Sequence, residues 1–151
     1  MLKERLESVK NLLESYNRDD AVREILDLAY DYDLEYYTEN IIEEEMMDEL
    51  VKIIEEMGIS FAYDHFAEGE SPDPPFICYL LSGSDNFAAD GRVYLKVNEV
   101  HIELYTDLKD LSVEQKVESV LDSHGIFYDR LETWIESEKM YEVLYSFEME
   151  A

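Results

Sequence analysis

The most restrictive feature of this sequence is an alternation between Tyr141 and Glu150 of apolar positions with positions that are polar except for Leu144. The apolar positions are Tyr141, Val143, Tyr145, Phe147 and Met149. A repeat of two predicts a β-strand that buries one face and leaves the other to solvent. Carboxylates occupy most of the opposite positions, so this strand requires a sheet that is covered on its apolar side. Residues 127–135 are the predicted antiparallel partner, with a turn at residues 136–139.

The first third of the chain has a different period, which is typical of amphipathic helices. Its apolar residues are Leu2, Leu6, Val9 and Leu13, followed by Ala21, Ile25, Leu28 and Tyr32. Residues 15–20 separate the two sets, and Asp19 or Asp20 can cap the second helix. A third helix is predicted over residues 41–57 and ends at Gly58, with a joint before it at residues 36–40.

From Gly58 onward the pattern changes to short extended segments. Residues 59–63 predict a short strand or extended entry, and three prolines exclude regular structure from residues 67–75. The apolar run 76–81 predicts a central strand that is covered on both faces. Residues 93–105 alternate again, but the phase changes at Asn98-Glu99, which predicts a bulge or a tight hairpin there.

The remaining segments complete the predicted fold. Residues 85–91 predict a polar turn between strands. A helix is predicted to begin with Ser112 as N-cap and Gln115 as its capping-box partner, and to end at His124-Gly125. The order of elements predicts an α+β fold: an antiparallel four-stranded sheet with flanking helices, preceded by an N-terminal helical extension.

Acidic side chains outnumber basic ones by 38 to 12, which gives the 151-residue chain a net charge of −26. Nucleic-acid binding depends largely on Lys and Arg at phosphates, so this excess opposes it. Hydrophobic residues still make up 46% of the chain, which is enough for a core. No apolar run is long enough to span a bilayer, and the mixed charges after Met1 are not those of a signal peptide. We therefore expect a soluble protein, made in a cytoplasm, with no membrane partner.

Residues that could carry catalysis are few and scattered. Of the histidines His65, His101 and His124, only His101 would share a strand face with a nearby carboxylate, that of Glu103, and two ligands are too few for a zinc site. The single cysteine, Cys78, lies in an apolar run, where a thiol is typically inert. The sequence has no phosphate-binding glycine loop and no nucleophile elbow. It therefore predicts no catalytic residue, no metal site and no cofactor.

The 12 tyrosines are more informative than the charged residues. Amphipathic aromatic rings are typical of protein interfaces, where the ring is buried and the hydroxyl stays hydrogen-bonded. Any one of them can equally well complete the core. As a group they favour an oligomer or a partner-binding protein over a catalyst.

Six segments between residues 47 and 151 occur in an order that is familiar from one family. They are Met47-Asp48-Glu49-Leu50, Ile59-Ser60-Phe61-Ala62-Tyr63, Pro75-Phe76-Ile77-Cys78-Tyr79, Asp85-Asn86-Phe87-Ala88-Ala89-Asp90-Gly91, Ile102-Glu103-Leu104-Tyr105-Thr106-Asp107 and Trp134-Ile135-Glu136-Ser137-Glu138-Lys139-Met140-Tyr141. Together they resemble the tail-completion proteins of long-tailed bacteriophages, also called tail terminator or tail-to-head joining proteins. The resemblance does not extend to residues 1–46, so we expect an α+β tail-completion-like domain at 47–151 after a separate helical extension at 1–46.

The resemblance implies a structural virion protein, made in the bacterial host cytoplasm and located at the head–tail junction. Such proteins form a homo-oligomeric ring, commonly hexameric, that ends the tail tube and meets the head–tail connector or adaptor proteins. DNA would pass through the ring without specific binding, and an acidic wall suits that role because it repels phosphates. The residues expected at interfaces are Pro72, Pro74, Pro75, Phe87, Trp134, Tyr141 and Tyr145.

Two other functions are compatible with the sequence. The first is an acidic protein that imitates DNA, or another host-directed binding module, which would need carboxylates in a stripe on one surface. The second is a small metal-dependent enzyme, which the scattered histidines disfavour.

Overall fold

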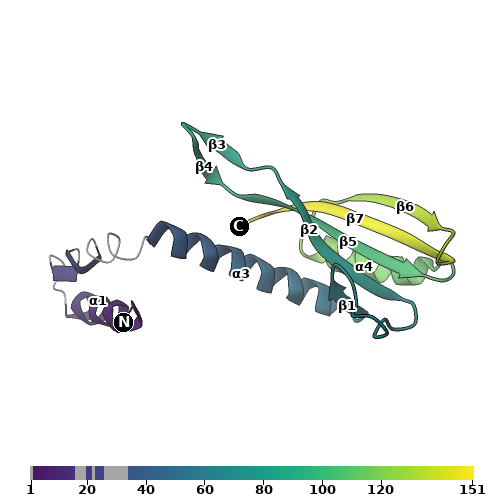
Figure 1. The fold of residues 1–151 in the computed structure, drawn as a ribbon, viewed down its shortest axis with the longest axis horizontal. Coiled ribbons are helices and arrows are strands. Elements are labelled where there is room, and N and C mark those ends of the chain that lie inside the picture. The colour runs from purple at the N-terminus through teal and green to yellow at the C-terminus, as the bar shows by residue number, and fades with distance from the viewer. Residues whose placement is uncertain (1, 16–19, 22, 26–33) are drawn as a thin grey trace. The chain divides into compact units, whose positions relative to one another are not determined.

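The structure is a computed structural model that describes residues 2–15, 20, 21, 23–25 and 34–151. The chain divides into two compact units, Met1–Glu44 and Glu45–Ala151. The second unit holds the sheet. Figure 1 shows the elements of both in chain order.

The first unit is helical in its described part. Helix α1 spans Leu2–Glu14, and its Val9 is buried, as is Ala21. Arg5 Nε donates to Glu24 Oε1 at 3.1 Å. The second predicted helix is helical at residues 20, 21 and 23–25 and otherwise lies, like the proposed cap Asp19, outside the described residues.

Helix α3 spans Leu34–Glu56 and crosses from the first unit into the second. The predicted joint at residues 36–40 is therefore wrong. That stretch contains neither Gly nor Pro, so nothing in it breaks the helix. Gly58 ends the helical region with a φ of 66°, a left-handed conformation that glycine adopts at low cost.

The second unit is built on a five-stranded sheet with the order β1-β2-β5-β7-β6 (Figure 1). The strands are β1 (Ser60–Tyr63), β2 (Phe76–Ser84), β5 (Val97–Thr106), β6 (Asp129–Ile135) and β7 (Met140–Glu150). Strand β1 runs parallel to β2, whereas the pairs β2–β5, β5–β7 and β6–β7 are antiparallel. The α+β class is confirmed. Residues 59–63, predicted as a short strand or extended entry, include β1, but the prediction of a four-stranded antiparallel sheet left this fifth, parallel strand out. The loop between β1 and β2 returns the chain to the same end of the sheet, which makes their pairing parallel.

A separate two-stranded sheet projects from the ends of β2 and β5 (Figure 1). It consists of β3 (Phe87–Ala89) and β4 (Arg92–Leu95), and we call residues 87–95 the arm. Asp90 and Gly91 form its two-residue turn, with φ values of 52° and 74°, which suit the right-handed twist of a hairpin. The polar turn predicted at residues 85–91 is thus confined to these two residues, and a strand precedes it.

The alternating stretch 93–105 is split between the arm and the main sheet. The break falls at Lys96, between β4 and β5, and not at Asn98-Glu99. A register shift occurs instead in β2, between Leu81 and Gly83, opposite Val100 and Glu99 of β5. The change in the alternation of apolar residues therefore corresponds to a real irregularity. It marks the region in which β2 and β5 leave the five-stranded sheet and continue into the arm.

Helices α3 and α4 (Leu111–Ser123) cover one face of the sheet and enclose the core. The fully buried side chains include Leu50, Ile54 and Met57 near the end of α3, Val117 and Leu121 of α4, and Ile77, Ile102, Leu104, Val143 and Tyr145 of the strands. Residues 76–79 of β2 are buried on both faces, as predicted. The apolar alternation of β7 also faces this core, and its partner strand and turn lie where the sequence placed them.

The N-cap of helix α4 lies two residues before the predicted one. Asp110, not Ser112, is the N-cap, because its carboxylate accepts hydrogen bonds from the backbone N–H groups of Ser112 at 3.0 Å and Val113 at 3.2 Å. The predicted end is confirmed, with His124 as C-cap and Gly125 at a φ of 66°.

Candidate functional site

The predicted interface residue Tyr145 is not on the surface. Its side chain is 0% exposed and lies in the core, where its ring meets that of Tyr128 edge-on at 5.5 Å. Its hydroxyl donates to Glu118 Oε1 at 3.2 Å, which satisfies the one polar atom that burial would leave unpaired. Tyr145 is therefore a core residue, and its assignment to an interface is wrong.

Trp134 and Tyr141 form a ring pair at one end of the β6–β7 hairpin. Their centroids are 4.8 Å apart, and Trp134 Nε1 donates to Glu136 Oε2 at 2.6 Å. Trp134 remains exposed, as does Leu131 on the same strand. Strand β6 pairs only with β7 among the described residues, so this hairpin presents a free strand edge with apolar side chains.

The proline-containing loop lies between β1 and β2. Pro72 and Pro74 are half-buried and Pro75 is exposed. Phe66, from the same connection, packs edge-on against Phe76 of β2 at 5.5 Å. This loop covers part of the sheet edge and offers only a small apolar surface.

The arm carries the most exposed of the predicted interface residues. Phe87 is 64% exposed, and Val93 and Leu95 are also exposed. Phe87 is opposite Leu95 in the ladder and shares a face of the arm with it, whereas Val93 is opposite Ala88, beyond a register shift, and lies on the other face. Arg92 is exposed and pairs with Ala89, two residues from Phe87 and on the same face. A two-stranded ribbon with exposed apolar side chains is marginally stable alone and typically gains order from a partner.

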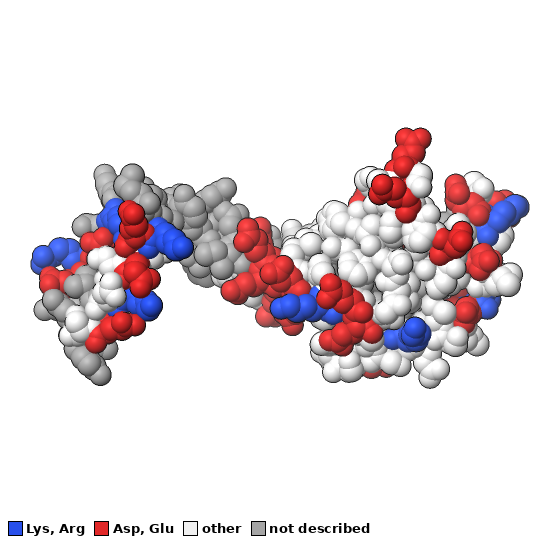
Figure 2. Space-filling model, turned by 90° about the horizontal axis from the view of Figure 1, so that it is seen from below, with Lys and Arg blue, Asp and Glu red and all other residues white. Residues whose placement is uncertain are grey.

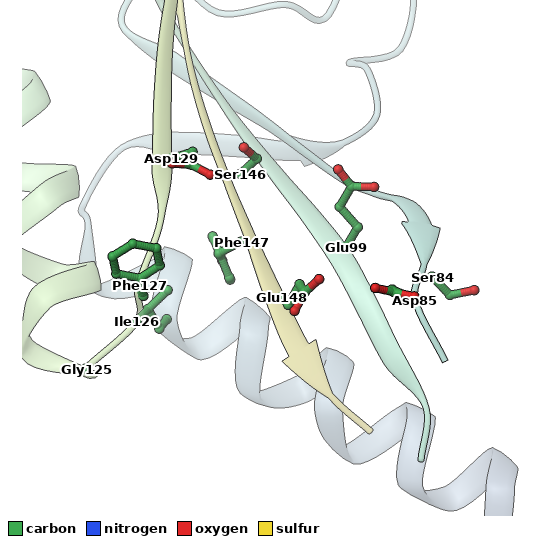
Figure 3. A pocket seen from close by; sticks show the side chains of 10 residues that line it. All are labelled: Ser84, Asp85, Glu99, Gly125, Ile126, Phe127, Asp129, Ser146, Phe147 and Glu148. Atoms are coloured by element: carbon green, nitrogen blue, oxygen red, sulfur yellow. The ribbon is translucent and has the colours of Figure 1, made fainter. Parts of the chain in front are cut away.

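A cavity of about 590 Å³, which was not predicted from the sequence, lies beside the end of β7, and we call it the edge cavity. Figure 3 shows it between the end of β2, strands β5 and β7, and the connection from α4 to β6. Its lining residues are Ser84, Asp85, Glu99, Gly125, Ile126, Phe127, Asp129, Ser146, Phe147 and Glu148. Four of the ten are carboxylates and none is basic, and Phe127 beside them is 89% exposed. The exposed Phe127 directly after a helix end is the only signal in the sequence that could have indicated this site.

The face of the sheet opposite the core carries a hydrogen-bonded group of two carboxylates and a phenol. The Tyr105 hydroxyl lies 2.8 Å from Glu103 Oε2 and 2.9 Å from Glu142 Oε2. It carries one hydrogen and can donate to only one of them at a time. Burial raises the pKa of Glu103, against the opposing effect of its hydrogen bond with Tyr105. Burial also raises the pKa of the neighbouring Cys78 thiol to about 11, so the thiolate that nucleophilic chemistry needs is scarce at neutral pH.

A second charged group joins α4 to β6 and to the loop before α4. Glu114 is 4% exposed, and its carboxylate accepts hydrogen bonds from Lys109 Nζ and from an Arg130 guanidinium nitrogen. Glu132 accepts from the same lysine, which lowers the pKa of Glu132. The hydrogen bonds satisfy the buried carboxylate, so the arrangement fixes the helix on the strand.

Each of the three histidines has one carboxylate within hydrogen-bond distance. His65 Nδ1 lies 2.8 Å from Asp64, His101 Nε2 lies 3.3 Å from Glu99, and His124 Nε2 lies 3.0 Å from Glu56. His101 also interacts electrostatically with the predicted Glu103. Within residues 2–15, 20, 21, 23–25 and 34–151, no three His, Cys, Asp or Glu side chains converge as metal ligands would. None of the described helices combines the length and apolar character that a bilayer span requires.

Comparisons with known proteins found matches among solved structures. No protein-family model matches the chain, and no curated protein matches it. Among solved structures, the chain is similar to one from the virion of a native gene transfer agent (GTA) particle, at 12% sequence identity and a TM-score of 0.44. The match covers 65% of this chain and 82% of the other.

Proposed function

We propose that this protein is a structural subunit of a phage-type virion, which forms a ring that ends the tail tube and joins it to the head–tail connector. One observation carries the proposal: the second unit has a complete core and yet exposes large apolar side chains on several separate surfaces. They are Phe87, Val93 and Leu95 on the arm, Phe127 at the edge cavity, Leu131 and Trp134 on β6, and Leu108 and Leu111 before α4. Single exposed apolar residues are common, but groups of them mark interaction surfaces.

A ring subunit needs several such surfaces. In a closed ring each copy contacts two neighbours through two different patches, and a subunit at a junction also meets the proteins above and below it. A monomeric catalyst needs one recessed site in place of these surfaces. The resemblance of residues 47–151 to tail-completion proteins supports the same role.

The distribution of charge supports passage of DNA without binding. Figure 2 shows acidic side chains with few basic ones among them on the visible face of the second unit. With a net charge of −26 per chain, a ring of such subunits would repel phosphates from its inner wall. The same repulsion opposes association, so apolar patches must provide the attraction between copies.

The proposal is tested by the native mass of the purified protein and by particle images of it, alone and with tail tube and connector proteins. We expect a hollow ring, either free or formed on the tube. A protein that remains monomeric in the presence of both partners contradicts the proposal.

One observation favours the DNA-mimic alternative. Residues Glu45–Glu56 of α3 expose carboxylates along most of their length, including Glu45, Asp48, Glu49, Glu55 and Glu56. Such a row can imitate a run of phosphates. Titration with host DNA-binding proteins at increasing salt separates the two functions, since a mimic binds them tightly and loses affinity with salt whereas a ring subunit does not bind them.

A further inference from the structure

We propose that the arm of one copy adds as a strand to the end of β7 in a second copy and occupies its edge cavity. This inference rests on the proposed function and specifies the contact that joins neighbouring subunits. It is argued from the unpaired strand edges, from the match in length, and from the charge on each side.

Strand β7 is longer than its outer partner. Strand β6 begins at Asp129, opposite Ser146, so residues 147–150 of β7 pair with β5 on one side and with no described strand on the other. Ala151 donates its N–H to Lys96 at 3.0 Å, on the β5 side. Because an antiparallel ladder alternates, Glu148 and Glu150 direct their N–H and C=O groups to the unpaired side.

The arm has a matching free edge. Strand β4 pairs only with β3 among the described residues, and it spans four residues, Arg92–Leu95. Four residues of β7, 147–150, are unpaired on their outer side. Strand addition at such an edge uses main-chain hydrogen bonds for attraction and alternate side chains for selectivity.

The side chains of the two partners are complementary. The arm exposes Phe87, Val93 and Leu95, and the cavity offers Phe127 with the half-buried Ile126. Strand β4 also carries the exposed Arg92, and the cavity has carboxylates at Asp129 and Glu148 (Figure 3). The arm, residues 87–95, contains one basic and one acidic residue, a net charge of 1 − 1 = 0, whereas the whole chain carries −26. The arm is thus a neutral element on an acidic protein, so the acidic cavity does not repel it, and Arg92 can pair with a carboxylate there.

The contact is head-to-tail, since arm and cavity are different surfaces of each copy. A second copy that receives an arm still has its own arm free for a third. Such heterologous contacts form a ring if the rotation between copies closes, and a filament if it does not.

A mixing experiment tests the contact with two full-length variants. An arm variant carries Val93→Ser and Leu95→Ser, and a cavity variant carries Phe127→Ser and Glu148→Lys. All four side chains except that of Leu95 lie well exposed, so circular dichroism should report unchanged folding.

Each variant alone should associate about tenfold or more weakly than the parent protein. Their mixture should yield a heterodimer that grows no further, because only one intact arm and one intact cavity remain. Leu6→Ser, at an apolar side chain of α1 that is 49% exposed against 46% for Val93, is the matched control and should assemble as the parent does.

Cysteine cross-linking identifies the contact directly. Val93→Cys in one copy and Glu148→Cys in another should form an intermolecular disulfide on oxidation only when the two are mixed, and the buried Cys78 should not compete. No cross-link, at the highest concentration at which the protein stays dissolved, overturns the inference, as does full assembly of the arm variant.

The outcomes separate this inference from the function on which it rests. Rings that form without the cross-link leave the proposed function standing and reject the arm contact. Cross-linked copies that form neither a ring nor a complex with the tail tube support the arm contact and reject the ring function.

Discussion

Replacing Glu114 by Gln should destabilise the second unit strongly, although the two side chains have the same size. Glu114 is 4% exposed and holds both Lys109 and Arg130. Removing one partner of a buried ion pair costs about 3–5 kcal/mol. Lys109 and Arg130 keep 37% and 35% of their side chains exposed, and both still face Glu132, so water and that carboxylate compensate part of the loss. We expect a loss of about 2–3 kcal/mol, or a decrease in Tm of about 10 °C.

Urea unfolding followed by far-UV circular dichroism measures this loss. The matched control is Glu136→Gln, because Glu136 also accepts from a lysine, Lys139, and from Trp134, but is exposed. The control should unfold at the midpoint of the parent protein. If both substitutions shift the urea midpoint equally, the burial of Glu114 does not explain how strongly its ion pairs stabilise the protein.

Three further substitutions or measurements have defined expected results. Glu103→Gln should raise Tm at about pH 7 but not at about pH 4. Burial raises the pKa of Glu103 in the folded state, so the folded protein keeps the proton on this carboxyl group at a higher pH than the unfolded chain does. The folded state therefore loses stability as pH rises through that pKa, and glutamine, which carries no charge, avoids the loss. Gly125→Ala should cost about 1 kcal/mol in urea unfolding because φ is 66° there, whereas Gly83→Ala, without a positive φ, should cost less. Cys78, buried and with its pKa raised to about 11, should react with iodoacetamide only after unfolding, and rapid labelling of the folded protein would contradict its placement.

Much of the fold was predictable because its patterns are local. The alternation of β7, the hairpin with β6 and the end of α4 at Gly125 each depend on neighbouring residues, and all three are confirmed. The N-cap of α4 was misplaced by two residues because Asp110 and Ser112 are both good caps. Only the three-dimensional arrangement shows that the Asp110 carboxylate reaches two N–H groups.

What escaped prediction depends on contacts between distant segments. Val93 and Leu95 have the same period as core residues, and nothing local indicates that β2 and β5 leave the sheet before them. The parallel pairing of β1 is also non-local. Tyr145 belonged by its alternation to the buried face, and the interface assignment followed from its residue type alone. Glu118, in a different element, supplies the hydrogen bond that allows its burial.

The position of β7 in the sheet has a consequence for synthesis of the protein. It is made after β5 and β6, yet it lies between them and is the only strand that β6 pairs with in the described structure. Until β7 has left the ribosome, nascent β5 and β6 each expose a strand edge without hydrogen-bond partners. The core residues that pack against β7 in the folded protein are then still exposed on that side. The growing polypeptide is then most vulnerable to aggregation, and chaperones that shield extended segments should act in that interval.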